Sequence, residues 1–187
     1  MTSKLDQVLD AIDTANAADP RLDEGQPESL LYGQRMSAEV ARLFPEASDL
    51  LQIAARGQHV ERWTLARSSF PEGRAGYLAW RKALAVHHAE ITSAMMRDAG
   101  FETPDVETVG RMLRKEGLKQ DTQVQALEDV ICFVFLKWYF APFAAKHAAD
   151  KIQRIVEKTA RKMSAEARAR VLVEFDLPEA LAAAFRD

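Results

Sequence analysis

Cysteine is nearly absent from the 187-residue chain: Cys132 is the only one, so no disulfide can form within the chain. Cys132 lies in an apolar run of residues 130–136, and we therefore expect a small core side chain rather than a reactive thiol. The first residues lack the apolar segment of a signal peptide. Both observations favour a reducing, cytoplasmic setting.

Long apolar runs are missing as well. The most apolar stretch, residues 130–145, contains Lys137 and is shorter than the about 20 residues that a membrane span needs. We expect a buried helix there, and no membrane partner. The 25 Lys and Arg residues are outnumbered by 28 Asp and Glu, which gives a net charge of −3. This balance argues against a surface that coats nucleic acid but is compatible with a local basic site.

Strand-like alternation and internal repeats are also lacking, whereas apolar residues recur at helical spacing almost everywhere. The predicted class is therefore all-α, and the length suits one domain spanning 1–187. A first amphipathic helix is predicted to begin at Ser3, and prolines and glycines predict loops at 18–27 and 66–74. The later helices are predicted at 28–44, 46–63, 75–99, 104–115 and 122–140, with two or three more from 144 onward.

Two of these helices carry polar residues that bear on a site. At 100° per residue, Gln34 shares a face with Leu30 and is predicted to point into the core. Gln58 lies at the edge of the next apolar face, and His59 would point away from that face unless Gly57 loosens the helix. A buried amide costs about 1–3 kcal/mol unless it is hydrogen-bonded, so a bond to a nearby carbonyl is the alternative to a ligand contact.

Two later helices add titratable groups. His87 and His88 are adjacent and cannot face the same way, so one must be more buried, and the sequence leaves open which. Either imidazole could bind a metal, carry a proton or simply pack. Glu128 and Asp129 enter a helix that is apolar on every side, so at least one carboxylate is expected at a cavity wall. There it needs a metal, a cation or several donors, and an arginine salt bridge is the structural alternative.

These four places, in this order, resemble the HD superfamily of metal-dependent phosphohydrolases. Residues 50–62 are similar to the helix that ends in that family's His-Asp pair, and residues 88–101 to its later histidine helix. The resemblance implies an HD-like multi-helix bundle over 28–140. Residues 144–187 lie outside the HD-like pattern, and we expect a helical extension there that packs on the core or forms a homodimer contact. It places Gln34, Gln58, His59, His88 and Asp129 at the family's ligand positions.

The whole chain more narrowly resembles a family catalogued as a domain of unknown function, DUF4202. Its members carry a Gln-His-x-x-Arg-Trp motif, an Arg-Ser-Ser-(Tyr/Phe)-Pro loop and a Gly-Tyr-Leu-x-Trp-Arg segment. The corresponding residues here are 58–63, 67–71 and 76–81. This resemblance is specific in its motifs but implies no activity.

The HD resemblance implies a divalent metal (Mn, Fe, Zn or Mg) held by His59, His88 and Asp129, with His59 and Asp129 also counted as catalytic. The metal would activate water for hydrolysis of a phosphoester, and Glu61 or Glu90 would take the proton. At two positions where the resemblance leads us to expect histidine, this chain has the amides Gln34 and Gln58. Amides are poor ligands for transition metals. A metal-free binding module of HD-like shape, for a nucleotide, another anion or a protein, is therefore the alternative. A two-iron oxidase would demand more ligands than the chain offers.

Arginines suggest that the ligand is an anion, because their planar fork matches phosphate. We expect a small phosphorylated ligand, a nucleotide or another phosphoester, and a solvated basic face is the alternative. Trp63 and Trp80 could stack on a base or pack in the core. The predicted ligand-binding residues are Gln34, Gln58, Arg62, Arg67, Arg74 and Arg81.

Overall fold

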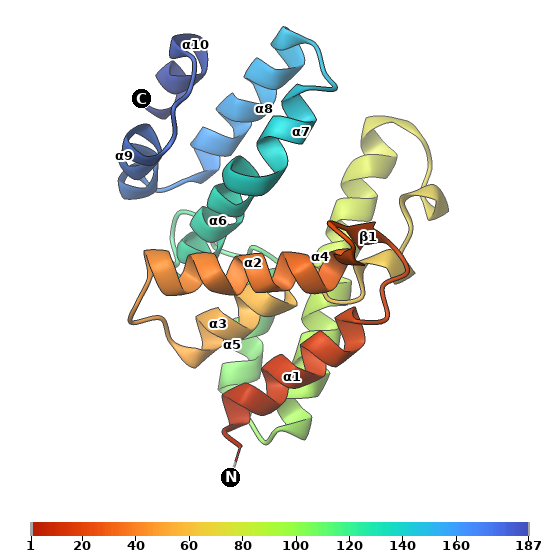
Figure 1. Cartoon of the computed structure of the whole chain (residues 1–187). Coiled ribbons are helices and arrows are strands. Elements are labelled where there is room, and N and C mark those ends of the chain that lie inside the picture. Colours follow the sequence, from red (N-terminus) through yellow and green to blue (C-terminus); the bar gives the residue numbers. More distant parts are fainter. Residues whose placement is uncertain (1, 187) are drawn as a thin grey trace. The chain divides into compact units, whose positions relative to one another are not determined.

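Helices account for nearly all the regular structure in the computed structural model, which describes residues 2–186 and confirms the all-α class (Figure 1). The chain forms two compact units: unit 1 extends to Glu116, and unit 2 begins at Gly117. None of the helices among the described residues is both long and apolar enough to cross a bilayer. Each unit is described separately below.

Unit 1 is built around a short apolar helix. Its elements are α1 (Lys4–Asn16), the antiparallel hairpin β1 (Leu22–Asp23) and β2 (Gln26–Pro27), α2 (Glu28–Leu43), α3 (Asp49–Gly57), the 3-10 turns η1 (Arg62–Thr64) and η2 (Arg67–Ser69), α4 (Gly73–Asp98) and α5 (Thr103–Leu113). Helix α3 packs against α1, α2, α4 and α5. Its side chains Leu51, Ile53 and Ala54 are buried, so α3 forms the centre of the core.

The ends of several helices follow the signals in the sequence. The Ser3 hydroxyl accepts from the Asp6 amide at 3.0 Å, and the Asp6 carboxylate accepts from the Ser3 amide at 3.3 Å, so the predicted cap of α1 is confirmed. Gly100 follows α4 with a φ of +81°, as a helix-ending glycine does. The hairpin occupies part of the segment predicted to be a loop at 18–27.

The third helix is shorter than predicted. It ends at Gly57 rather than at residue 63, and the chain then passes through Glu61, which has a left-handed φ of +49°. A Cβ at Gly57 would lie 2.5 Å from the Thr92 hydroxyl oxygen, so α3 and α4 approach each other closely there. Glycine at position 57 thus permits the close crossing of α3 and α4 at the end of α3.

The prediction that Gln34 points into the core is wrong, because Gln34 is exposed. The buried face of α2 contains Leu31, Met36 and Val40, and it also contains Arg35. The Arg35 guanidinium pairs with Asp23 and with Glu24 of the hairpin at 2.8 Å each. The apolar residues Leu31, Met36 and Val40 thus define the buried face of α2, and the paired arginine shares it.

Unit 2 begins with the most apolar helix of the chain. Its elements are α6 (Thr122–Val134), the π-helical turn η3 (Phe135–Tyr139), α7 (Phe140–Ala144), α8 (Ala149–Lys162), α9 (Ala165–Glu174), α10 (Glu179–Ala182) and the 3-10 turn η4 (Ala183–Phe185). Helices are thus present at 122–140 and beyond 144, as predicted. The boundary between the two compact units follows Glu116. The HD-like core over 28–140 and the extension over 144–187 stay predictions. That the two units together form one domain stays a prediction.

Gly76 should be essential for the way that the chain before α4 packs on that helix. A Cβ at Gly76 would lie 1.8 Å from the Pro71 carbonyl oxygen, which is a backbone atom that cannot rotate away. Gly76→Ala should therefore lower the free energy of unfolding by about 1–3 kcal/mol, measured by urea denaturation. Without this contact, alanine would instead stabilise the helix by about 1 kcal/mol. A more stable Gly76→Ala variant would disprove the contact, and Ala79→Gly at an exposed position measures the helix-propensity effect alone.

Candidate functional site

The segment between α3 and α4, residues 58–72, folds back along α4, and we call it the strap. Three α4 residues hold it. The Trp80 indole N–H donates to the Leu65 carbonyl at 2.9 Å, and His87 Nε2 lies 3.1 Å from both the Glu61 carbonyl oxygen and the Thr64 hydroxyl. Gly76 contacts Pro71. His87, whose orientation the sequence left open, is therefore a residue that positions the strap.

Arg67 holds the far end of the strap. Its guanidinium donates to the Phe70 carbonyl at 3.0 Å and to the Gly73 carbonyl at 3.4 Å. These two bonds fix the loop just before α4. Arg67, which was predicted to bind a ligand, thus also holds the loop in place. Arg74, another predicted ligand-binding residue, follows the loop and is exposed.

Asn16 fixes the near end of the strap, and the sequence interpretation missed it. Its side-chain oxygen accepts from the Glu61 amide at 3.0 Å, and its side-chain nitrogen donates to the Ser29 carbonyl at 3.4 Å. Asn16 is fully buried at the end of α1. A signal did exist, since Asn16 continues the i, i+4 stripe of the buried residues Val8 and Ile12.

Two of the predicted metal ligands, His59 and His88, lie close together. The His59 ring stacks on Tyr32, with ring centroids 3.7 Å apart, and its centroid lies 5.9 Å from that of His88. His88 is only 3% exposed, whereas His87 is partly exposed, so His88 is the more buried of the adjacent pair. The strap and α4 thus bring together two imidazoles that are far apart in the sequence.

Both of these imidazoles are neutral at pH 7. Burial, reinforced by the positive charge of Arg62, holds the pKa of His59 well below its usual 6.5. Burial and Arg62 likewise lower the pKa of His88 from 6.5 to about 3. The pKa of Arg62 is itself lowered, first by burial and then by Arg81. These directions indicate a positive local potential around the two rings.

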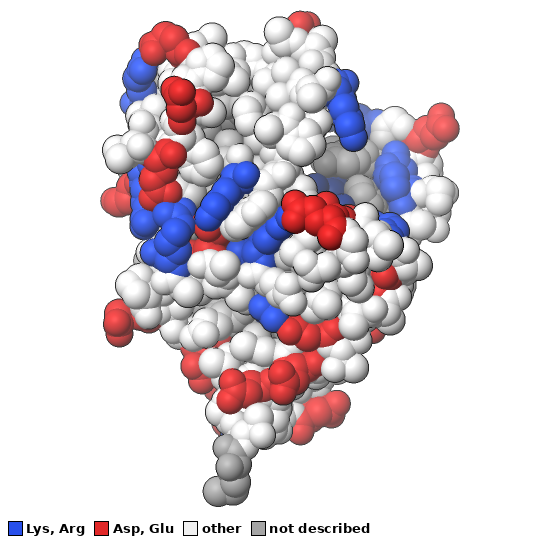
Figure 2. Space-filling model, in the orientation of Figure 1, with Lys and Arg blue, Asp and Glu red and all other residues white. Residues whose placement is uncertain are grey.

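The arginines around this cluster differ from others in unit 1. Arginines 21, 35, 42, 56 and 114 each pair with a carboxylate. Arg62, Arg67, Arg74 and Arg81 form no ion pair with any residue from 2 to 186; instead Arg62 lies 4.8 Å above the Trp80 ring centroid. On the face drawn in Figure 2, acidic side chains gather over the lower part, where Figure 1 places α1. The strap and the start of α4 therefore carry arginines that no described carboxylate holds in an ion pair.

Three buried polar atoms between α3 and α4 lack hydrogen-bond partners within the described part of the chain: Gln58 Oε1, His88 Nε2 and Thr92 Oγ1. Each such atom costs about 1–3 kcal/mol. The three residues adjoin the close contact between Gly57 and Thr92. Unsatisfied groups of this kind, beside unpaired cations, are typical of a site kept for function rather than for stability.

The predicted acidic residues do not gather around His59 within unit 1. Glu61 is half-buried in the strap, and Glu90 is exposed on α4. Asp129 belongs to unit 2, where its Oδ1 accepts from the Ser164 amide at 2.8 Å and its Oδ2 from the Ser164 hydroxyl at 2.7 Å. Burial raises the pKa of Asp129 despite the bonds from Ser164 and Gln125. Asp129 therefore connects α6 to the start of α9.

Glu128, the other carboxylate at this point of α6, is also buried. Its Oε1 lies 3.5 Å from Lys162 Nζ at the end of α8. Lys162 is thus one cation beside this pair of acids, and Ser164 is the main donor to Asp129.

Unit 1 by itself does not supply a complete set of metal ligands. The strap and α4 supply two imidazole nitrogens, from His59 and His88, but no carboxylate joins them in this unit. Across residues 2–186, no three His, Cys, Asp or Glu side chains are grouped so that they could hold a metal ion. The cluster therefore offers an arginine-rich surface for an anion more readily than a complete set of metal ligands.

His88 should make stability depend on pH. In the unfolded chain the His88 imidazole takes up a proton near pH 6.5, whereas in the folded chain it stays neutral down to about pH 3. This contribution to stability is therefore fully present above pH 6.5 and falls as the pH drops below it, by up to about 1.4 kcal/mol per pH unit. Urea denaturation at neutral and mildly acidic pH measures the slope. His88→Met should make this slope shallower, and equal slopes in His88→Met and the parent protein would refute the assignment.

Comparison with known proteins gives one match. The profile of a family described as a domain of unknown function, DUF4202, matches residues 6–184. No curated protein and no solved structure matches the chain. The matched region includes the strap, both histidines and unit 2 almost to its end. The chain therefore belongs to the DUF4202 family.

Proposed function

We propose that unit 1 binds a small phosphorylated ligand at the strap and the start of α4, and that it does so without a metal. The observation that carries this proposal is the group of arginines without carboxylate partners next to two neutral imidazoles. A half-buried cation without a counter-charge is costly, and a bound anion removes that cost. Belonging to DUF4202 is compatible with this proposal but does not define an activity.

Arg62 and Arg81 are the main contacts in this proposal. Both act electrostatically on His59 and on His88, so their charges lie near both rings. A guanidinium donates two parallel N–H bonds to phosphate oxygens, and such charge-assisted bonds are about twice as strong as neutral ones. Arg62 is held over Trp80, and Arg81 donates to the Tyr77 hydroxyl at 3.3 Å, so both side chains are partly preorganised.

His59 provides a neutral hydrogen-bonding group beside these charges. Stacking on Tyr32 fixes the plane of its ring. Its lowered pKa keeps it from adding a third positive charge next to Arg62 and Arg81. The ring can therefore donate one hydrogen bond to the ligand, and the arginines supply the charge.

The proposal predicts a specific loss of anion binding. Arg62→Gln and Arg81→Gln should each weaken pyrophosphate binding about 10-fold or more, because a charge-assisted hydrogen bond contributes about 1.5–3 kcal/mol. Isothermal titration calorimetry in the presence of a chelator measures this binding without metal. Arg97→Gln is the matched control, since Arg97 is an exposed arginine near the other end of α4. Equal binding in the Arg62, Arg81 and Arg97 variants would refute the site.

A metal-dependent phosphohydrolase is the second candidate. The observation that favours it is that His59 and His88 are neutral, with ring centroids 5.9 Å apart, and that His88 Nε2 has no partner among residues 2–186. Neutral imidazole is the form that binds a metal. Under this candidate Asp129 is the third ligand, and Glu61 or Glu90 takes a proton. The HD-like ancestry suggested by the sequence belongs to this candidate.

Metal content separates the two candidates. Under the metal-free proposal, purified untagged protein should contain no stoichiometric Mn, Fe, Zn or Mg by elemental analysis. About one metal per chain, lost in His59→Ala, His88→Ala and Asp129→Ala variants that still fold, would support the hydrolase instead. That result would contradict the metal-free proposal and would justify a phosphatase assay over nucleotides.

A further inference from the structure

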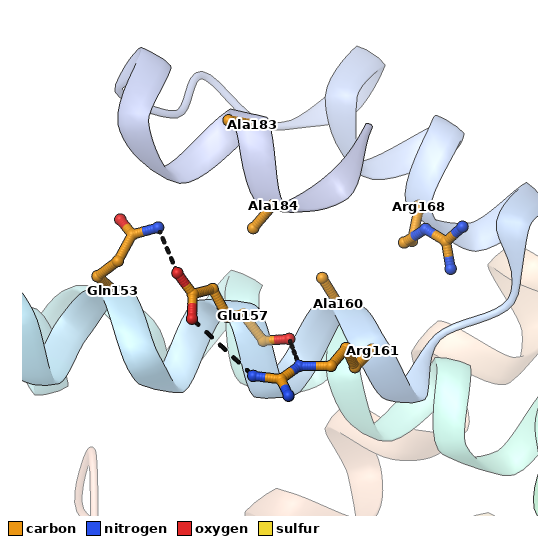
Figure 3. A pocket seen from close by; sticks show the side chains of 7 residues that line it. All are labelled: Gln153, Glu157, Ala160, Arg161, Arg168, Ala183 and Ala184. Carbon is orange, nitrogen blue, oxygen red and sulfur yellow. Dashed lines mark hydrogen bonds and ion pairs between the residues drawn. The ribbon is translucent and has the colours of Figure 1, made fainter. Parts of the chain in front are cut away.

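Unit 2 contains an open hollow of about 520 Å³ that neither the sequence motifs nor the proposed function involves. This volume lies in the range of about 300–1,000 Å³ that is typical of small-ligand sites. The residues lining it come from α8, α9 and η4: Gln153, Glu157, Ala160, Arg161, Arg168, Ala183 and Ala184. Figure 3 shows Ala183 and Ala184 on η4 across the hollow from α8.

The middle of the hollow is apolar. Ala160 on α8 and Ala183 and Ala184 on η4 present only methyl groups, and Ala160 is almost completely buried. Small side chains on facing elements leave space that larger ones would fill. A short apolar body of two or three carbons could lie against these methyl groups and lose its contact with water.

One end of the hollow is positively charged. Arg161 from α8 and Arg168 from α9 both line it, and Figure 3 shows them toward the same end. Arg168 donates to the Met163 carbonyl at 3.3 Å and pairs with no carboxylate in the described chain. The Arg161 guanidinium lies 3.9 Å from the Glu157 carboxylate, at the limit of an ion pair. Two guanidiniums are thus opposed by one distant carboxylate.

Gln153 holds that carboxylate in place. Its side-chain nitrogen donates to Glu157 Oε1 at 3.1 Å and to the Ala180 carbonyl at 3.3 Å. Glu157 is therefore directed toward Gln153 as well as toward Arg161, as the dashed lines in Figure 3 show. The hollow is thus preorganised, with a cationic end, a methyl-lined middle and an amide at the other end.

We propose that this hollow binds a small carboxylate with a short apolar body. The carboxylate would lie between Arg161 and Arg168, and the apolar body against the alanines. A bidentate guanidinium contact matches the planar carboxylate geometry, and the methyl-lined middle selects against a bare inorganic anion. A free carboxylic acid and the C-terminal carboxylate of a peptide share this chemistry. All the lining residues belong to unit 2, so the proposal is independent of the anion site in unit 1.

Butyrate tests the proposal directly, with amide chemical shifts of the full chain followed by NMR. Butyrate should shift the amides around residues 157–168 and 183–184, and butylamine and inorganic phosphate should not. Arg168→Gln should weaken butyrate binding about 10-fold, as the loss of one charge-assisted contact does. Arg170→Gln is the matched control, because Arg170 also lies on α9 but pairs with Glu174 and does not line the hollow.

A second variant fills the hollow without changing charge. Ala184→Met should abolish butyrate binding while the circular dichroism spectrum of the protein stays unchanged. N-acetylalanine and its amide distinguish the sources: if N-acetylalanine binds as well as butyrate and its amide does not, a peptide C-terminus fits the site, and if butyrate binds and N-acetylalanine does not, the ligand is a free acid. Equal shifts with phosphate or butylamine, no butyrate-induced shifts at all, or unchanged binding in Arg168→Gln and Ala184→Met would overturn the proposal.

Discussion

One buried amide, Asn16, fixes the geometry on which the candidate site of unit 1 depends. Its side-chain oxygen accepts a hydrogen bond from the Glu61 amide, and its side-chain nitrogen donates one to the Ser29 carbonyl. Asn16 thus connects the end of α1, the start of α2 and the beginning of the strap. Glu61 has a φ of +49°, a conformation that a non-glycine residue rarely adopts without support. The turn places His59 on one side of Glu61 and Arg62 on the other, so this one side chain governs where both groups of the site lie.

Helix α4 supports the other side of the same arrangement. Gly76 and Trp80 lie one turn apart and contact the later part of the strap. His87 contacts the turn formed by Glu61 and Thr64. His88, the next residue, faces inward beside His59. A single helix thus uses one face to hold the strap and the adjoining face to build the buried polar cluster. The adjacent histidines therefore have different roles, because successive helical side chains point about 100° apart.

The sequence predicted the helices well, because apolar periodicity and capping residues are local signals, as the cap at Ser3 and the glycine at Gly100 demonstrate. It also singled out His59 and His88 as candidate site residues, but it could not show that their ring centroids lie 5.9 Å apart. Gln34 was misplaced because the face of Leu30 was taken as the buried one, whereas the buried face of α2 contains Leu31, Met36 and Val40. The roles of Asn16 and of Ser164 beside Asp129 depend on contacts between distant segments, and helical spacing carries no information about those.

Asp129 in α6 and the polar residues at the end of α3 are both buried but differ in their hydrogen bonds, and this difference supports function at the strap. Asp129 is buried in unit 2, but Ser164 and Gln125 satisfy both of its oxygens, so the group contributes to the junction of helices. In unit 1, Gln58 and His88 are buried with atoms that no described residue satisfies, and Arg62 beside them forms no ion pair within residues 2–186. Three unsatisfied atoms and a half-buried cation together lower the stability by several kcal/mol on the ordinary scale of such groups, about 1–3 kcal/mol each. A chain of this length has a total stability of only about 5–15 kcal/mol. A cost of that size at one place is best explained if the folded protein spends part of its time with a polar, anionic ligand bound there.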